Sequence, residues 1–446
     1  MASETAQTRE GLAFGERVPV FAPSRRAIIL LVFALILIGF ALRIALLFLM
    51  QEAYVSPHTE PMNIAVSLAT TGNYADAYGS GVGPTAHCAP LLPLLLSCFV
   101  LLFGIYTPAT ALAAHVAASF ASALAFALLP VLAAESGLPL ACGVLAGLAG
   151  VLLPISFWFQ ISGSVDAPFT AAALVAICIL VCRIRARRRF TKRNGAALGV
   201  ATGLCCLLNP VILPIIIGCL VVILLQNRQR LKRMLIFCGV SAGCIVATLT
   251  PWAIRNYEVM GSLIWTRSNF WMEMHLSNND VLTADEITNF AMPQFARMHP
   301  TLSLIERAKV KRLGEVAYMG TKRDQFLAWL STHKRRFLAL TAERFRLFWI
   351  PKMSRLIQTI PEAGLTVVAL SGLALLFRSK HYSAWILGAI IGLYPPAYYL
   401  VMVTPRFRVP LEPFLFLLGG YCVLRTATAL YRSRWRPSAN TAFVRR

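Results

Sequence analysis

The sequence predicts an all-α membrane protein that crosses the bilayer many times, and three observations support this fold class. Of its 446 residues, 57% are hydrophobic and 14% are charged, and the mean hydropathy is +0.66. Apolar runs of the length that crosses a bilayer recur along the chain, and several are separated by short turns rich in Arg and Lys. Because a soluble core cannot bury this much apolar surface, we expect about ten transmembrane helices.

The net charge of +23 at pH 7 reflects 42 basic and 19 acidic residues. Such a charge is typical of nucleic-acid binders, of proteins that bind anionic lipids, and of membrane proteins with basic cytoplasmic loops. Here the basic residues gather in short loops between apolar runs, above all at 183–193, where seven of eleven residues are Arg or Lys. This pattern indicates a positive-inside orientation and favours membrane lipids over nucleic acid as partners.

The first part of the chain predicts a tail, a membrane helix and a long polar loop. Residues 1–26 are polar and end in two arginines, so we expect a cytoplasmic tail. The apolar run 27–49 is the first helix of an N-terminal transmembrane module, 27–251. Residues 50–89 are too polar and too rich in Gly and Pro to span, and they form a first outer loop with a helical pattern at 62–69.

The rest of this module contains further apolar runs. The run 88–104 has two prolines near its start, and we expect it to be interfacial or re-entrant, because five full crossings would place the basic loop 183–193 outside. The run 195–226 is broken by Asn209 and Pro210 and is interpreted as two short helices. The other crossings are expected at 109–134, 138–157, 165–182 and 234–251.

The last part of the chain predicts an outer domain and a second group of membrane helices. Residues 252–362 are charged and helical in pattern, so we expect a mainly helical periplasmic domain. The C-terminal transmembrane helices occupy 363–430, with apolar runs at 363–377, 383–403 and 411–430. The basic residues that follow place 431–446 in the cytoplasm as a tail.

Two carboxylates are the candidate catalytic residues. Carboxylates at a membrane face are costly unless they have a partner or a role, and in this topology Glu60 and Asp166 lie where the outer face meets the membrane. Glu60 begins a short helical stretch, and the alternative for it is a solvated surface position. Asp166 precedes a helix that has Pro168 in its first turn, so N-capping is an equally good explanation of this residue.

Three arginines are candidate ligands of a phosphate. Arg406 and Arg408 flank an aromatic residue in the Pro-bounded segment TPRFRVP, between two apolar runs at the outer face. Forked guanidinium groups suit a phosphate or pyrophosphate, and the alternative is anchoring to lipid headgroups. Arg255, followed by Asn256, offers a second pair of this kind. A carboxylate and arginines on one face predict a site that activates a hydroxyl against a phosphate leaving group.

The sequence does not establish a cofactor. It contains no P-loop, GxGxxG, HExxH or GxSxG pattern, so a soluble nucleotide is not expected as the source of energy. His58, His87 and His275 lie on the expected outer face, where they either bind a divalent metal together or are ordinary loop histidines. The spacing of these histidines does not decide between the two.

Several stretches, taken in order, resemble membrane glycosyltransferases of the GT-C superfamily. Glu60 followed by IAVSLATTGNYADAYGSGVGPTAHCAPLLPLLL resembles the first outer loop of that group. SVDAPFTAAAL, GLCCLLNP, TPWAIRNYEVMGSLIWTRSNFWMEMHLSNN, HPTLSLIERAKVKRLGEVAYMG and PRFRVPLEPFLFLL resemble its later landmarks. The sequence is most similar to bacterial proteins of glycosyltransferase family 39, relatives of dolichyl-phosphate-mannose protein mannosyltransferases and of the lipid A aminoarabinose transferase.

The resemblance implies a GT-C fold and an inverting enzyme of a bacterial inner membrane. Such an enzyme takes a sugar from a polyprenyl-phosphate donor at the periplasmic face. Glu60 then matches the catalytic base and Asp166 the second acidic position, while Arg406 and Arg408 match the end that holds the donor phosphate. His58, His87 and Asn256 become candidate substrate contacts, and the acceptor can be a protein, a lipid or a glycan.

The sequence departs from the group at some of these positions. Many relatives have an Asp-Glu pair or a nearby tyrosine where this chain has His58-Thr59-Glu60-Pro61, and His87 and His275 stand where bulkier aromatic residues are common. Two alternatives therefore remain open. One is a multi-pass transporter or lipid flippase, which would place its charges near the middle of the bilayer. The other is a family member without catalytic activity.

Overall fold

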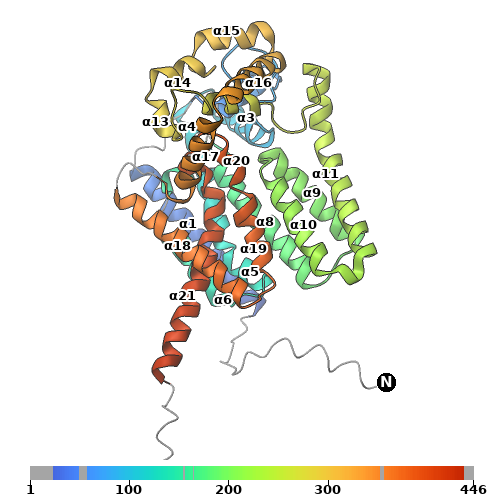
Figure 1. Cartoon of the computed structure of the whole chain (residues 1–446), viewed down its shortest axis with the longest axis vertical. Coiled ribbons are helices and arrows are strands. Elements are labelled where there is room, and N and C mark those ends of the chain that lie inside the picture. Colours follow the sequence, from blue (N-terminus) through green and yellow to red (C-terminus); the bar gives the residue numbers. More distant parts are fainter. Residues whose placement is uncertain (1–23, 50–57, 154–155, 164, 352–355, 436–446) are drawn as a thin grey trace, which may run out of the picture.

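The computed structural model describes residues 24–49, 58–153, 156–163, 165–351 and 356–435 (Figure 1). Most of the two expected tails and the start of the first outer loop, residues 1–23, 436–446 and 50–57, lie outside this part of the chain. Within it, all the regular elements are helices, and pairing between extended segments is limited to the isolated bridges Ala75–Pro84 and Asp285–Val403.

Six helical segments in the described ranges are long and apolar enough to cross a membrane, which confirms an all-α polytopic membrane protein. They comprise α1 (Arg25–Leu49), α4 and α5 (Pro108–Ala127 and Leu129–Glu135), α8 (Ala167–Ala186), α11 (Leu231–Met260), α18 (Leu356–Arg378) and α21 (Glu412–Trp435). Shorter apolar helices are α3 (Leu91–Phe103), α6 (Leu140–Leu152) and α10 (Ile212–Gln226). With 13 residues each, α3 and α6 are about 20 Å long, which is shorter than the bilayer core.

Proline explains where several helices begin or break. The apolar run 195–226 is divided at Pro210 into α9 (Lys192–Leu208) and α10, as expected. The run 383–403, which we expected to be one crossing, is instead divided into α19 (Ala384–Leu393) and α20 (Pro396–Tyr399). The break falls where Tyr394 is followed by Pro395 and Pro396.

The boundary expected at residue 251 differs in the structure. Helix α11 continues through Pro251 to Met260, so the outer domain begins after a helix that extends beyond the membrane. Tertiary contacts compensate for the proline. The indole of Trp252 donates to the carbonyl of Thr266, and Arg255 donates to carbonyls of the first outer loop. The last turns of α11 are therefore held by loops that local sequence patterns do not connect to them.

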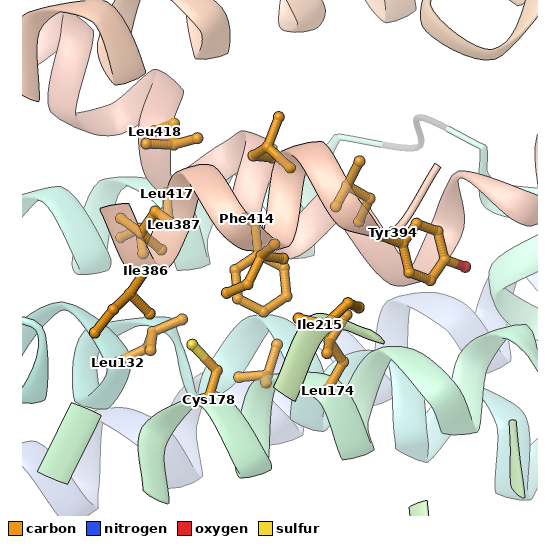
Figure 2. Close-up of a cluster of buried hydrophobic side chains, with 14 of the residues drawn as sticks. Leu132, Leu174, Cys178, Ile215, Ile386, Leu387, Tyr394, Phe414, Leu417 and Leu418 are labelled. Carbon is orange, nitrogen blue, oxygen red and sulfur yellow. The ribbon is translucent and has the colours of Figure 1, made fainter. Parts of the chain in front are cut away.

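The membrane core is formed by central helices that bury apolar side chains against one another. Figure 2 shows part of this cluster, in which residues of α8, α10, α19 and α21 interdigitate, including Leu174, Ile215, Leu387 and Phe414. Helix α9 packs closely on α11, because a Cβ at Gly199 would come within 2.4 Å of the carbonyl of Ser241. Peripheral helices such as α1 instead expose large apolar residues, which lipid tails can cover.

The loops expected in the cytoplasm meet at one end of the bundle. Glu135, the last residue of α5, pairs with Arg183 and Arg187 at N–O distances of 2.8 and 3.3 Å. The guanidinium of Arg185 lies 3.8 Å from the ring centroid of Tyr382, between α18 and α19. Turns that are distant in the sequence therefore lie together at this end of the helix bundle.

The outer domain covers the other end of the bundle (top of Figure 1). Its helices are α12 (Phe270–Ser277), α13 (Glu286–Phe290), α14 (Pro293–Met298), α15 (Leu304–Leu313), α16 (Glu315–Thr332) and α17 (Lys334–Trp349). They pack on α2 (Glu60–Thr71) of the first outer loop through buried residues such as Ile64, Tyr78, Met272 and Tyr318. Three 3₁₀ turns, η1 (Arg228–Arg230), η2 (Pro405–Phe407) and η3 (Val409–Leu411), and the short α7 (Phe157–Ile161) complete the fold.

A buried carboxylate connects the first outer loop to this domain. Glu315, at the start of α16, accepts hydrogen bonds from the backbone N–H of Ala86 at 2.8 Å, from the hydroxyl of Ser268 at 2.6 Å and from Thr85. Burial raises the pKa of this carboxyl, although its three donors favour the charged form. Three segments of the chain therefore converge on this side chain, which joins the first outer loop to the outer domain.

Candidate active site

A cavity of about 260 Å³ lies between the first outer loop, the start of α8, the outer domain and the segment before α21. Four separate parts of the chain therefore contribute to its wall. Its titratable lining consists mainly of four carboxylates, two arginines and three histidines: Glu60, Asp166, Glu273, Glu286, Arg267, Arg406, His58, His87 and His299. Of the residues that the sequence indicated, the structure brings together Glu60, Asp166, Arg406, His58 and His87.

Glu60 is the first residue of α2, with Thr59 in an extended conformation before it and Pro61 in the first turn. Its Oε1 accepts a hydrogen bond of 2.6 Å from the hydroxyl of Thr301 and lies 3.8 Å from Nε2 of His299. Burial by itself would raise the pKa of this carboxyl. The positive charges that His299 and His87 acquire in acid, together with the Thr301 hydroxyl and the backbone N–H of Glu60, outweigh burial and hold the pKa below its usual value. Glu60 is therefore an ionised carboxylate at neutral pH.

Asp166 pairs with Arg267, a residue of the segment between α11 and α12. Nη2 of Arg267 lies 2.9 Å from Oδ2 of Asp166, and about a quarter of each side chain is exposed. Asp166 occupies the N-cap position of α8, but its side chain makes no capping hydrogen bond, so capping does not explain this residue. Burial opposes the charge of Arg267, but Asp166 outweighs it and raises the pKa of the guanidinium.

Arg406 in η2 pairs with Glu286, the first residue of α13, at an N–O distance of 3.1 Å. The two segments meet because Val403 exchanges backbone hydrogen bonds with Ala284 and Glu286, at 2.9 and 3.0 Å. One third of the Arg406 side chain is still exposed. Part of its guanidinium therefore remains accessible to a ligand.

Glu273 on α12 is a carboxylate without a cationic partner in a described contact, and Asn269 donates to it at 3.3 Å. Burial, together with the nearby charge of Glu286, raises the pKa of this carboxyl to about 7. The charge of the cavity consequently changes near neutral pH.

The three predicted histidines do not meet. His87 lines the cavity and shares a hydrogen bond of 2.9 Å with the hydroxyl of Tyr78, and burial lowers the pKa of His87 to about 4. His58 also lines the cavity and lies against the ring of Tyr106. His275 is outside it, near Lys322 in the outer domain. In the part of the chain that the structure describes, no group of three His, Cys, Asp or Glu residues could hold a metal ion.

Three predicted residues have structural contacts away from the cavity. Arg408 is 1% exposed, pairs with Glu362 at 3.0 Å and donates to Thr366 and to the carbonyl of Trp349. Arg406 is in η2 and Arg408 follows η2 in helical conformation, and residues two apart in helical backbone lie on different sides of the helix. Arg255 donates to the carbonyls of Tyr74 and Thr85, and Asn256 donates to the carbonyl of Ile264.

The sequence did not indicate five residues that the structure adds to the site, Arg267, Glu273, Glu286, His299 and Thr301. All five come from the outer domain or the segment leading into it. Four of them lie within the motif stretches TPWAIRNYEVMGSLIWTRSNFWMEMHLSNN and HPTLSLIERAKVKRLGEVAYMG. Membership of these stretches is the sequence feature that could have indicated them. Many other charged residues share these stretches, so sequence alone does not select them.

The comparisons with known proteins identify the fold. No family model matches the sequence, and no curated protein matches it. The structure is similar to the archaeal oligosaccharyltransferase AglB from Archaeoglobus fulgidus in complex with an inhibitory peptide and a dolichol-phosphate, with a TM-score of 0.55 and 13% identity over 92% of this chain and 51% of that chain. The apo form of the Archaeoglobus fulgidus oligosaccharyltransferase gives a TM-score of 0.54 and 13% identity over 92% of this chain and 52% of that chain.

ArnT from Cupriavidus metallidurans, bound to undecaprenyl phosphate, is also similar, with 14% identity over 92% of this chain and 80% of that chain and a TM-score of 0.37. This chain spans about half the length of the archaeal oligosaccharyltransferase. The likeness to that enzyme and the all-helical membrane architecture agree with the fold that the ordered sequence stretches indicated. The chain therefore has the GT-C fold.

Proposed function

We propose that this protein is an inverting glycosyltransferase that moves a sugar from a polyprenyl-phosphate donor to a hydroxyl acceptor at the periplasmic face of a bacterial inner membrane. One observation carries the proposal. The ionised carboxylate of Glu60 lines the same cavity as the guanidinium groups of Arg267 and Arg406. A base for the acceptor and cations for a phosphate leaving group are the two requirements of such a displacement.

Glu60 acts as the general base in this proposal. Its Oε1 is held by Thr301, and Oε2 is the oxygen that we assign to the acceptor hydroxyl. The acceptor oxygen attacks the anomeric carbon as the bond from that carbon to the phosphate oxygen breaks, and the bonding electron pair leaves with the phosphate. The proton of the hydroxyl passes to Glu60. Because a carboxylate with a lowered pKa is a weak base, this transfer comes late, when the attacking oxygen is already acidic.

Arg267 and Arg406 stabilise the departing phosphate. A guanidinium has five N–H donors, and the carboxylates of Asp166 and Glu286 engage Nη2 of each arginine. These partners orient the cations and leave other N–H groups for the donor. Asp166 thus serves the reaction through Arg267, and Arg267 takes the place that the sequence suggested for Arg408.

The size of the cavity and the neighbouring structure support the class of donor. A volume of about 260 Å³ is below the usual range for drug-sized ligands and suits a single sugar unit. The archaeal oligosaccharyltransferase of the same fold was solved with a dolichol-phosphate. A donor whose lipid part stays in the membrane is compatible with a cavity at the outer end of the bundle.

A transporter or flippase is the alternative, and the position of the cavity argues against it. The charges that line the cavity come from the first outer loop, the outer domain and the starts of α8 and η2. The charged groups deeper among the membrane helices, such as Arg408 and Glu362, are instead fully buried and paired. A tag inserted in the outer domain after residue 280 provides an independent test of orientation. Its detection in the cytoplasm would contradict a periplasmic active site.

The decisive experiment removes the base and keeps the shape. Purified protein is incubated with a panel of polyprenyl-phosphate sugars and acceptors, and the products are analysed by mass spectrometry. Glu60→Gln is expected to lower sugar transfer about 10²- to 10⁴-fold, the usual contribution of a general base. Glu258→Gln, at an exposed position near the end of α11, is the matched control and is expected to retain activity. Unchanged transfer by Glu60→Gln would overturn the assignment.

A further inference from the structure

We infer that the turn His299–Pro300–Thr301 of the outer domain sets the position of the catalytic base, with His299 and Thr301 as positioning residues for Glu60 and Arg307 as the residue that fixes the turn. This inference rests on the proposed function. It extends that proposal, because residues of the outer domain then control the position of the base. The base itself, Glu60, belongs to the first outer loop.

The turn connects two helices of the outer domain. The N–H of His299 donates to the carbonyl of Phe295 and ends α14, while the carbonyl of His299 accepts from Leu302 and Ser303 at 3.0 and 2.8 Å. The hydroxyl of Ser303 then caps α15 by accepting from the N–H of Glu306. With both ends fixed by helices, residues 299–301 form a short, hydrogen-bonded projection that reaches α2.

Both side chains of this projection approach the same oxygen of Glu60. The Thr301 hydroxyl lies 2.6 Å from Oε1, and Nε2 of His299 lies 3.8 Å from it. The backbone N–H of Thr301 donates to Nδ1 of His299 at 3.3 Å. Since that N–H can only donate, the proton of the neutral imidazole is on Nε2, the atom that faces Glu60. Burial lowers the pKa of His299, which keeps the ring neutral despite its carboxylate neighbours.

This tautomer decides what His299 can do. A ring that carries its proton on Nε2 presents an N–H to Glu60 and has no free lone pair there to accept the proton that Glu60 receives. His299 therefore orients the carboxylate and favours its charged form. It does not relay the proton. With Oε1 directed at the turn, we assign Oε2 to the acceptor.

Arg307 on α15 holds the turn from behind. Its Nη2 donates to the carbonyl of Thr301 at 2.5 Å, and its Nε donates to the carbonyl of Pro300 at 3.4 Å. The same guanidinium packs on Gly79 of the first outer loop, where a Cβ would lie 3.1 Å from Nη1 and the backbone φ is +128°. Glycine is required at this close approach. Arg307 thus connects the loop that carries Glu60 with the turn that orients it.

The pH dependence of the reaction reports on this arrangement. The groups around Glu60 that carry or can carry charge come from every neighbouring element: His58, His87, Asp166, Arg267, Glu273, Glu286, His299 and Arg406. The Thr301 hydrogen bond favours the ionised form of Glu60 and so contributes to its lowered pKa. Loss of that bond raises the pKa, and the acid limb of kcat moves to higher pH by about one unit, the effect of one charge-assisted hydrogen bond.

The experiment compares Thr301→Val with Thr301→Ser in the full-length protein, using the donor that supports transfer by the unchanged chain. Thr301→Val is expected to shift the acid limb upward, to lower kcat about tenfold at neutral pH and to leave the donor KM within about twofold. Thr301→Ser keeps the hydroxyl and is expected to restore the unchanged profile. Thr321→Val, which removes an exposed hydroxyl of α16, is the matched control.

His299 is tested in the same way. His299→Gln keeps an N–H donor near the position of Nε2 and is expected to retain most of kcat, whereas His299→Leu shifts the profile as Thr301→Val does. Activity lost equally in all four variants of these two positions, with an unmoved pH profile, would mean that the turn is only structural. If Glu60→Gln is inactive while Thr301→Val keeps the original profile, the positioning role is wrong and the proposed function stands. An active Glu60→Gln variant would refute the proposed base itself.

Discussion

Two arginines separated by one residue occupy regions of opposite character. Arg406 lies in the cavity, is 34% exposed and pairs with Glu286. Arg408 lies in the bundle beneath, is 1% exposed, and its guanidinium contacts Glu362, Thr366 and the carbonyl of Trp349. In the cavity, part of the Arg406 guanidinium remains accessible. In the bundle, the Arg408 guanidinium is buried against its structural partners. If Arg406 binds the donor phosphate as we propose, the difference from Arg408 shows that accessible donors, and not the residue type, distinguish a binding arginine from a structural one.

The buried region extends further through the membrane helices. Nη2 of Arg43 on α1 donates to Gln160 at 2.6 Å, and Nε2 of Gln160 donates to Glu412 on α21 at 2.7 Å. Arg43 also donates to the carbonyls of Gly39 and Gly150, and it is 2% exposed. Charge at this depth is tolerated because each group has partners. These contacts join α1, α7 and α21 below the cavity.

The largest expected effect comes from breaking the buried pair. Arg408→Met leaves Glu362 as an uncompensated buried charge, and we expect it to lower the free energy of unfolding by about 3–5 kcal/mol. The measurement is thermal unfolding of the protein in detergent. Arg408→Met combined with Glu362→Leu removes both charges and is expected to recover much of the loss. A single variant as stable as the unchanged protein would contradict a structural role for Arg408.

A smaller effect is expected for the arginine in the cavity. Arg406→Gln removes a charge that is partly exposed, so the protein is expected to fold with nearly unchanged thermal stability. Its donor KM should rise about 10- to 100-fold, the contribution of a hydrogen bond between charged groups. Steady-state kinetics over a range of donor concentration measures this. Glu286→Gln is the companion variant, because it keeps Arg406 in place and should change the donor KM less. A donor KM unaffected by Arg406→Gln would exclude the phosphate role.

The contrast between the two regions also shows what sequence could predict. Glu60 at a helix start, the break at Asn209 and Pro210, and the Pro-bounded segment around Arg406 all follow from local patterns and were predicted. The directions of Arg406 and Arg408 were not, because they depend on Glu286 and Glu362, which come from distant parts of the chain.

The same limit explains the missed residues of the outer domain. His299 and Thr301 reach Glu60 only because α14 and α15 bring their turn to α2. Glu286 reaches Arg406 through the bridge between residues 285 and 403. Such pairings depend on tertiary packing. The continuation of α11 past Pro251 has the same origin, since its contacts with the first outer loop override the local preference to end there.

The smallest expected effect concerns Glu273. This carboxyl changes its charge with pH in the cavity, whereas the charged groups beneath the cavity are paired with one another. With its pKa at about 7, this carboxyl is neutral in acid and becomes a further negative charge in the cavity as the pH rises. We therefore expect the donor KM to increase about fourfold between pH 6 and pH 8. An added charge repels a phosphate by ~1 kcal/mol in a hydrated site, and most of the titration falls between these two pH values. Glu273→Gln should remove this increase, which donor titrations at several pH values would detect.

The stability of the folded chain provides the control for Glu273. Its folded pKa lies above the value of 4.5 expected in the unfolded chain, so the folded protein binds this proton more tightly. The contribution of Glu273 to stability is therefore greatest in acid and is lost as the pH rises from about 4.5 to about 7. Glu273→Gln should flatten this dependence together with that of the donor KM. If both dependences persist in the variant, another group titrates in the cavity, and the pH response does not come from Glu273.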